Sequence, residues 1–274
     1  MPRELSGIIG LITDYGLKDP YVGSLKASIL SINPRVSIVD ISHEVSNFDV
    51  AEGAYILLSS YKIFPRGTVF VVVVDPGVGS SRKALLIETT NYYFIGPDNG
   101  VLRPAADEDG ILRVINLTND KYFRKPVSPT FHGRDIFGPV AAYLTLGVEP
   151  EKFGEIIDPR DITEAKIDLY CDKFGDWVKT YVIYIDKFGN AVTGCRIERF
   201  FELVKDLRES QQVIIRVRGV ESYRGVYYRT FSLAKPGEII LYTGSTGFME
   251  IGVNLSSFAK KIGCRRGDEI WISV

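Results

Sequence analysis

A short apolar segment, Thr68–Val74, constrains the fold of this chain more than any other part of the sequence. Its four consecutive valines, Val71–Val74, leave it without a polar face, which is typical of an interior strand in an α/β sheet. The segment is followed by Asp75 and then by the glycine-containing turn Pro76–Ser81. Because α/β sheets bind their ligands at the carboxyl ends of strands, we expect a functional site around Asp75.

Strand and helix patterns alternate through the first part of the chain. Gly7–Thr13 predicts the first strand, and Asp19 followed by Pro20 predicts the start of an amphipathic helix. Asp49 with Glu52 resembles a capping box, so a second helix is expected there. This alternation predicts an α/β domain with a largely parallel central sheet. Further strands are expected at Val36–Ile41, Ala84–Thr89, Tyr92–Ile95 and Ile111–Leu117, and a further helix at Asp135–Leu146.

The sequence pattern changes near Asp158, where polar residues interrupt the alternation. Beyond it, short segments rich in β-forming residues are separated by turns, and hardly any helical periodicity remains. We therefore predict two domains, an α/β domain over residues 1–160 and a smaller β-domain over residues 161–274. The predicted strands of the second domain are Trp177–Asp186, Gln212–Val217, Tyr223–Phe231, Glu238–Tyr242, Met249–Val253 and Glu269–Val274.

Charge and apolar content argue against several classes of partner. The chain has 33 Lys and Arg against 34 Asp and Glu, a formal charge of -1, so no basic excess is available for nucleic acid or an anionic membrane surface. No apolar run approaches the roughly 20 residues of a membrane helix. The cysteines Cys171, Cys195 and Cys264 are odd in number and lack metal-ligand spacing, and no signal-like stretch precedes Gly7. These features predict a soluble protein in the reducing cytoplasm, without a metal site.

Three residues from two distant loops are candidates for one polar constellation. Asp75 and Arg82 flank the glycine-containing turn, where their charges can meet as a structural or a functional ion pair. His132 lies in the polar loop Phe131–Asp135, and the pKa of a histidine suits proton transfer near neutrality. We expect the other histidine, His43, to make a structural hydrogen bond.

Other residues admit either a binding role or a structural one. Asp14, at the end of the first strand, is placed to accept ribose hydroxyls, but Asp is also common in turns. In the β-domain, Asp186 and Asn190 can bind an ammonium or a hydroxyl group, although turns are often built from the same residue types. Phe48 and Phe231 can stack on a purine, or they can close a hydrophobic core.

Two loops rich in glycine and hydroxyl residues indicate which anions the chain can bind. The loop Thr243–Glu250 contains Ser245, and its backbone N–H groups and hydroxyls can receive a carboxylate. Gly77 and Gly79 suggest a phosphate loop, but they fit neither the Rossmann nor the Walker spacing, and no Gly-Lys-Ser or Gly-Lys-Thr follows. We therefore reject a nucleoside triphosphate as the ligand.

Five segments follow one another along nearly the whole chain: Ile12–Gly16, Asp75–Gly79 with Arg82, Phe131–Asp135, Asp186–Asn190 and Glu250–Asn254. Taken together, they resemble the S-adenosyl-L-methionine hydroxide adenosyltransferase family, also known as DUF62 and related to the bacterial fluorinase and chlorinase. The resemblance implies an amino-terminal α/β domain, a β-barrel-like carboxyl-terminal domain, and a homotrimer that binds its substrate between subunits.

The resemblance also implies roles for individual residues. Asp75, Arg82 and His132 match the set that holds and activates a water molecule. The other implied assignments concern the substrate: Asp14 for the ribose hydroxyls, Asp186 and Asn190 for the amino acid or sugar end, Ser245 for the methionine carboxylate, and Phe48, Phe231 and the backbone of Glu250–Val253 for the adenosine.

The implied reaction is attack of water or hydroxide on C5′ of S-adenosyl-L-methionine, which gives adenosine and L-methionine without a cofactor. A halogenase is one alternative, but the Asp75 carboxylate would repel a halide ion, and the added loop of the halogenases is missing between Tyr93 and Arg113. The other alternative is a non-catalytic protein that binds adenosine or S-adenosyl-L-methionine.

Overall fold

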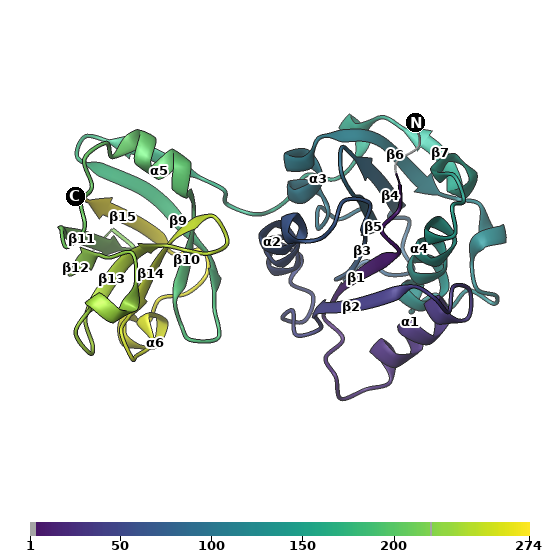
Figure 1. Cartoon of the computed structure of the whole chain (residues 1–274), viewed down its shortest axis with the longest axis horizontal. Helices are drawn as coiled ribbons and strands as arrows, with labels where there is room; N and C mark the ends of the chain where they lie inside the picture. The colour runs from purple at the N-terminus through teal and green to yellow at the C-terminus, as the bar shows by residue number, and fades with distance from the viewer. Residues whose placement is uncertain (1–3, 220) are drawn as a thin grey trace. The chain divides into compact units, whose positions relative to one another are not determined.

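The computed structural model describes residues 4–219 and 221–274. The chain divides into two compact units, Met1–Lys166 and Ile167–Val274, which are shown in Figure 1. Each unit has a hydrophobic core of its own. In the part of the chain that the structure describes, no helix combines the length and the apolar character that a membrane crossing requires.

The first unit is a seven-stranded sheet with helices on both faces. Its strands are β1 (Ile8–Thr13), β2 (Ser37–Ser42), β3 (Val69–Val73), β4 (Ala84–Thr89), β5 (Tyr93–Pro97), β6 (Ile111–Leu117) and β7 (Gly154–Ile157). Its helices are α1 (Tyr21–Leu30), α2 (Val50–Ser60), α3 (Arg103–Asp109) and α4 (Gly138–Thr145). Helices α2 and α3 lie on one face, and α1 and α4 lie on the other (Figure 1).

The strand order of this sheet is β2-β1-β3-β5-β4-β6-β7. Strands β1, β2, β3, β5 and β6 run in one direction, whereas β4 and β7 run in the opposite direction. The α/β class and the largely parallel sheet predicted from the sequence are therefore confirmed. The two reversed strands show that the sheet is mixed at one side, where β4, β6 and β7 lie.

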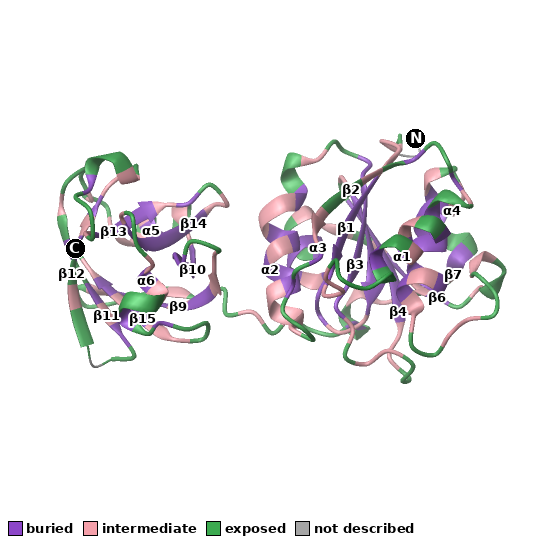
Figure 2. Cartoon of the chain, turned by 90° about the horizontal axis from the view of Figure 1, so that it is seen from below, coloured by how far each residue is buried: buried purple, intermediate pink, exposed green. Residues whose placement is uncertain are grey.

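The valine-rich segment forms the central strand β3. It pairs in parallel with β1 on one side and with β5 on the other, so both of its edges are hydrogen-bonded. Every residue of Val69–Val73 is buried, and Figure 2 shows the same burial along the neighbouring strand β1. Burial on both faces explains why the segment has no polar alternation. Asp75 is the first partly exposed residue after the strand, so its carboxylate lies at the carboxyl end of β3.

The helix boundaries differ from the predictions in informative ways. Asp49 caps α2 as predicted, because its side chain accepts a hydrogen bond of 3.0 Å from the backbone N–H of Glu52. At α1 the predicted cap is wrong: Pro20 occupies the N-cap position, and no side chain caps the helix. The helix expected to begin at Asp135 begins instead with the π-helical turn Gly133–Phe137, and α4 continues directly from that turn.

The second unit is a closed β-barrel. Its strands are β8 (Cys171–Phe174), β9 (Trp177–Ile185), β10 (Ala191–Arg196), β11 (Gln212–Val217), β12 (Glu221–Tyr227), β13 (Ile239–Thr243), β14 (Phe248–Val253) and β15 (Glu269–Ser273). The order β10-β14-β13-β12-β11-β15-β9 closes through pairing of β9 with β10, and β8 extends the sheet beyond β9. The barrel-like domain implied by the resemblance is confirmed.

Two short helices of the second unit were not predicted. They are α5 (Ile197–Leu203) and α6 (Phe258–Ile262), with seven and five residues. Segments of this length do not complete two helical turns, so they carry little of the 3.6-residue periodicity on which a prediction depends. A helix of similar length in the first unit, α3, was missed because its sequence is mainly polar and acidic.

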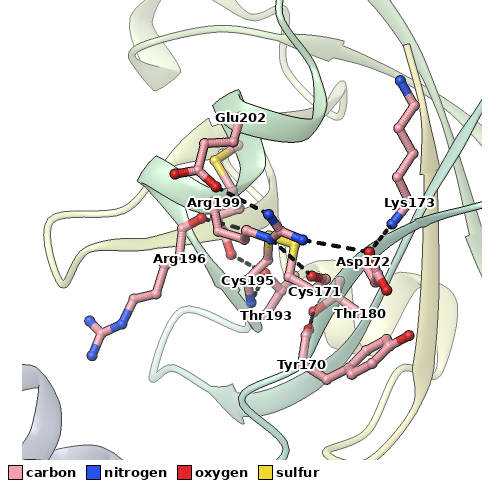
Figure 3. Close-up of a disulfide and its surroundings, with 11 residues drawn as sticks. Tyr170, Cys171, Asp172, Lys173, Thr180, Thr193, Cys195, Arg196, Arg199 and Glu202 are labelled. Carbon is pink, nitrogen blue, oxygen red and sulfur yellow. Dashed lines mark hydrogen bonds and ion pairs between the residues drawn. A yellow bond between two sulfur atoms is a disulfide. The ribbon is translucent and has the colours of Figure 1, made fainter. Parts of the chain in front are cut away.

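The structure contains a disulfide between Cys171 and Cys195, whose Cα atoms are 4.8 Å apart. Strand β9 pairs with both β8 and β10, which brings the two cysteines together, whereas Cys264 is free and buried. Figure 3 shows Arg199 beside the sulfur atoms, where its Nε donates to the backbone carbonyl of Cys171 at 3.4 Å. The interpretation of the cysteines as reduced thiols is therefore wrong for this pair. The cytoplasmic location stays a prediction.

Reduction of this disulfide should destabilise the second unit. The disulfide joins residues 24 positions apart and so restricts the unfolded chain. Loss of this restriction should lower the free energy of unfolding by about 3 kcal/mol. Denaturant unfolding with and without dithiothreitol measures the effect, and Cys171→Ser, which cannot form the bond, should not respond to the reductant. Equal stability of the wild-type protein in both conditions would show that the two sulfur atoms are not bonded in solution.

Candidate active site

Asp75, Arg82 and His132 lie together at the carboxyl end of β3. The Arg82 guanidinium donates from Nε to Asp75 Oδ1 at 3.0 Å and from Nη2 to Asp75 Oδ2 at 2.5 Å. The same Nη2 lies 2.8 Å from Nδ1 of His132. The pair is largely buried, since the Asp75 side chain is 5% exposed and that of Arg82 is 10% exposed. The three predicted residues therefore form one connected group, which we call the triad.

The geometry of the triad fixes the protonation of His132. A guanidinium has no acceptor, so it can only donate, and Nδ1 of His132 must accept with its lone pair. The imidazole is then neutral and carries its proton on Nε2. The pKa of His132 agrees with this state, because burial of the ring lowers it below the usual value of 6.5 and the positive charge of Arg82 lowers it further. His132 is therefore neutral at physiological pH.

Two loops must approach closely to build the triad, and Gly79 permits the approach. Gly79 has a φ of +79°, and a Cβ atom placed on it would lie 2.4 Å from the backbone oxygen of Pro129, in the loop that leads to His132. Only glycine combines this backbone conformation with so close a contact. The turn is also held internally, since Ser80 Oγ donates to the Gly77 carbonyl at 2.7 Å.

The Asp135 side chain holds the loop that carries His132 in place. This carboxylate is fully buried and accepts a hydrogen bond of 2.9 Å from the backbone N–H of Ser128. It also accepts two bonds from the Arg134 guanidinium, from Nε at 2.6 Å and from Nη2 at 2.7 Å. The π-helical turn that begins at Gly133 follows directly, and such turns often occur at functional sites. The local sequence His-Gly-Arg-Asp is thus a structural unit that fixes the His132 backbone.

Asp14 and Phe48 lie beside the triad in the same cavity, which has a volume of about 600 Å³. The Phe48 backbone N–H donates to Asp14 Oδ2 at 2.9 Å, and burial raises the pKa of the Asp14 carboxyl. Phe48 has a φ of +65°, which is strained for a bulky residue, and the residue is 68% exposed. Strained residues of this kind are typical of ligand sites, which fits the substrate-binding role predicted for Phe48.

In the second unit, Asp186 and Asn190 form a turn that leads into β10. Asp186 Oδ1 accepts from the backbone N–H groups of Phe188 and Asn190 at 2.9 and 2.8 Å, and Asp186 Oδ2 accepts from the Asn190 amide at 2.8 Å. These bonds make Asp186 a structural member of the turn. Asn190 also lines a pocket of about 520 Å³, together with Phe188, Phe231, Val253, Asn254, Leu255 and Ser256.

Close packing around Gly252 shapes this second pocket. A Cβ atom on Gly252 would lie 2.6 Å from the Asn190 side-chain oxygen and 2.9 Å from the Phe231 ring. The backbone of β14 therefore passes close to both the amide and the aromatic ring. The predicted residues Asn190, Phe231 and Val253 come together here, and their binding roles stay predictions.

Two further predicted residues, Glu250 and Ser245, do not line either pocket. The Glu250 side chain is buried and accepts a hydrogen bond of 2.5 Å from the Tyr242 hydroxyl, and burial raises the pKa of this carboxyl. The side chain of Glu250 therefore stabilises the barrel, and the ligand contact predicted for this residue involves its backbone. Ser245 is exposed in the turn between β13 and β14. Their binding roles stay predictions.

Four aromatic residues of the two pockets were not assigned from the sequence. Tyr15, Tyr21 and Phe131 line the cavity beside the triad. Phe188, which is 74% exposed, lines the pocket on the barrel. Phe188 lies inside the segment Asp186–Asn190, so its position in a recognised motif was an available signal. Aromatic residues near loops more often close a core, and only the structure shows that these rings face open cavities.

The α/β unit with its buried triad at a strand end and the closed barrel with its aromatic pocket define a two-domain enzyme. Comparison with known sequences identifies the class more closely. The SAM hydroxide adenosyltransferase N-terminal domain matches residues 9–154, and the SAM hydroxide adenosyltransferase C-terminal domain matches residues 180–271. The chain belongs to this family, which confirms the resemblance found in the sequence.

Individual proteins similar to this chain cover nearly its whole length. A protein of Methanocaldococcus jannaschii named (R)-S-adenosyl-L-methionine hydrolase is 34% identical, over 99% of this chain and 98% of the relative. The crystal structure of an uncharacterized conserved protein from Thermotoga maritima is 38% identical with a TM-score of 0.92, over 97% of this chain and 100% of that one. A fluorinase of an Actinoplanes species is more distant, at 25% identity over 97% of both chains.

Substitution of Gly79 tests the contact that builds the triad. Gly79→Ala should separate the two loops, so His132 should lose burial and its contact with Arg82, and its pKa should rise toward 6.5. Gly147→Ala is the matched control, because Gly147 has a φ of +89° but no atom within 4 Å of an added Cβ. An NMR titration of His132 measures both effects. A pKa that is unchanged in Gly79→Ala, or changed equally in the control, would contradict the assigned role of Gly79.

Proposed function

We propose that this protein hydrolyses S-adenosyl-L-methionine to adenosine and L-methionine. The observation that carries the proposal is the triad: Arg82 joins Asp75 and His132, and these two residues line the same cavity as Asp14. Relatives that share about a third of their residues with this chain over nearly the full length carry the name (R)-S-adenosyl-L-methionine hydrolase. S-adenosyl-L-methionine is the substrate in this reaction, and no cofactor is proposed.

The proposed reaction is a displacement at the ribose C5′ carbon. The oxygen of a water molecule forms a bond to C5′ while the C5′–S bond breaks. The bonding electron pair goes to sulfur, which changes the sulfonium into the neutral thioether of L-methionine, and one proton of the water is released. Because the sulfonium leaves without protonation, the enzyme needs only to orient the water and to accept its proton.

The triad geometry favours Asp75 as the proton acceptor. The lone pair of His132 Nδ1 already accepts from Arg82, and Nε2 carries the ring proton, so His132 can only donate to the water. The Asp75 carboxylate retains acceptor capacity beyond its two bonds from Arg82. In this proposal Arg82 holds both partners in place, and its positive charge favours the hydroxide that forms when Asp75 accepts the proton of the water.

The substrate contacts are proposed as follows. In the first unit, Asp14 accepts the ribose hydroxyls, and Phe48 packs on the adenosine, because both lie in the cavity of the triad. The barrel supplies Asp186, Asn190, Phe231, Ser245 and the backbone of Glu250–Val253 for the base and the methionine. We also propose a homotrimer with substrate sites between subunits, on the basis of the resemblance of the five motif segments to this family. Light scattering tests the number of subunits.

Analysis of the products tests the proposed reaction. Incubation of the purified protein with S-adenosyl-L-methionine in ¹⁸O-labelled water and without halide should release adenosine and methionine in equal amounts. The label should appear in the 5′-hydroxyl of adenosine, measured by mass spectrometry. A 5′-halogenated adenosine formed on addition of fluoride or chloride would favour a halogenase, and tight binding without turnover would favour a non-catalytic binding protein.

The pH dependence tests the neutral state of His132. Burial and Arg82 lower its pKa, so His132 stays neutral at pH 6.5 and gains a proton only at lower pH. Protonation then puts an imidazolium against the Arg82 guanidinium, and kcat/KM should fall through a midpoint below 6.5. His132→Gln keeps an acceptor oxygen but cannot titrate, so the remaining activity should lack this acid limb. A limb centred at or above pH 6.5 that vanishes in His132→Gln would contradict the assignment.

A further inference from the structure

Three aromatic residues, Tyr15, Tyr21 and Phe131, line the cavity that Asp75 and His132 of the triad also line. They come from three separate elements: the turn after β1, the first residue of α1, and the loop before the π-helical turn. The ring centroids are 5.9 Å apart for Tyr15 and Tyr21, 5.7 Å for Tyr15 and Phe131, and 5.4 Å for Tyr21 and Phe131. We call this group the aromatic wall.

The aromatic wall lies at the margin of the hydrophobic core of the first unit, against which Tyr15 packs. Both contacts of Phe131 are edge-to-face, with interplanar angles of 77° to Tyr15 and 88° to Tyr21, so the three rings brace one another. The Tyr15 hydroxyl lies close to Gly133, since a Cβ atom added to Gly133 would lie 2.4 Å from it. Yet Tyr21 is 48% exposed, and Tyr15 and Phe131 are only partly buried. An ordered but open group of rings is suited to contact a ligand.

The electrostatic setting of the wall favours a cation. The face of an aromatic ring is negative, and the Phe131 ring already has the Arg134 guanidinium 4.9 Å from its centroid. Arg134, which lines the cavity, is paired with Asp135, and Arg82 of the triad is paired with Asp75. The carboxylates of Asp14 and Asp19 also line the cavity. A positive ligand group therefore meets negative ring faces and excess carboxylate charge.

We propose that the aromatic wall recognises the sulfonium cation of the substrate and sets the preference of the site for a positively charged ligand over a neutral thioether. This inference rests on the proposed function. Ring faces attract the positive charge of the sulfonium more strongly than the neutral sulfur of a thioether. As water attacks, the sulfonium becomes a neutral thioether, and the attraction to the wall disappears when the products form.

The inference is tested with two stable ligands that differ in charge. Sinefungin carries an ammonium group at the position of the sulfonium, and S-adenosylhomocysteine carries a neutral thioether there. Calorimetry of the full-length protein should show tighter binding of sinefungin. In Tyr21→Leu this preference should fall about three- to tenfold, within the range of a cation–π contact, through weaker binding of sinefungin alone. Tyr21→Phe keeps the ring and should keep the preference.

Phe48→Leu is the matched control, because Phe48 is an exposed aromatic residue of the same cavity that is assigned to the adenosine. It should weaken both ligands by the same factor. If Tyr21→Leu also weakened both ligands equally, or left both unchanged, the role of the wall in charge recognition would be wrong while the proposed function stood. If the wild-type protein bound neither ligand, the proposed substrate and this inference would both be overturned.

Discussion

The whole candidate site depends on one shared donor, the Nη2 atom of Arg82, which bonds to Asp75 on one side and to His132 on the other. Removal of one partner from a buried ion pair typically costs about 3–5 kcal/mol, because the other charge is left without compensation. Arg82 therefore binds the turn after β3 to the loop before α4. The neutral state of His132, the acceptor role of Asp75 and the shape of the cavity follow from this arrangement.

The rest of the first unit supports this contact. Strand β3 carries Asp75 at its carboxyl end, paired on both sides and buried along its length. Gly79 allows the two loops to approach, and the buried carboxylate of Asp135 fixes the backbone that presents His132. Each of these features holds a triad member in place before a substrate arrives. Such preorganisation is how an enzyme orients a weak nucleophile such as water.

The sequence predicted the features that local chemistry determines. The burial of β3 followed from its valine run, the cap at Asp49 from its spacing to Glu52, and the triad from the polar loops after the strands. The disulfide was missed because β9 brings Cys171 and Cys195 together from a distance in sequence, and no spacing rule records that pairing. The aromatic wall was missed for the same reason, since its three rings come from separate elements.

The protonation of His132 is the most direct test of the account, because only a neutral ring with its proton on Nε2 can accept from Arg82. The chain has two histidines, so a long-range ¹H–¹⁵N NMR spectrum at neutral pH contains two imidazole patterns, and His132→Gln identifies that of His132. The account predicts a neutral His132 ring with a protonated Nε2 and an unprotonated Nδ1. A proton on Nδ1, in either the neutral or the charged ring, would contradict it.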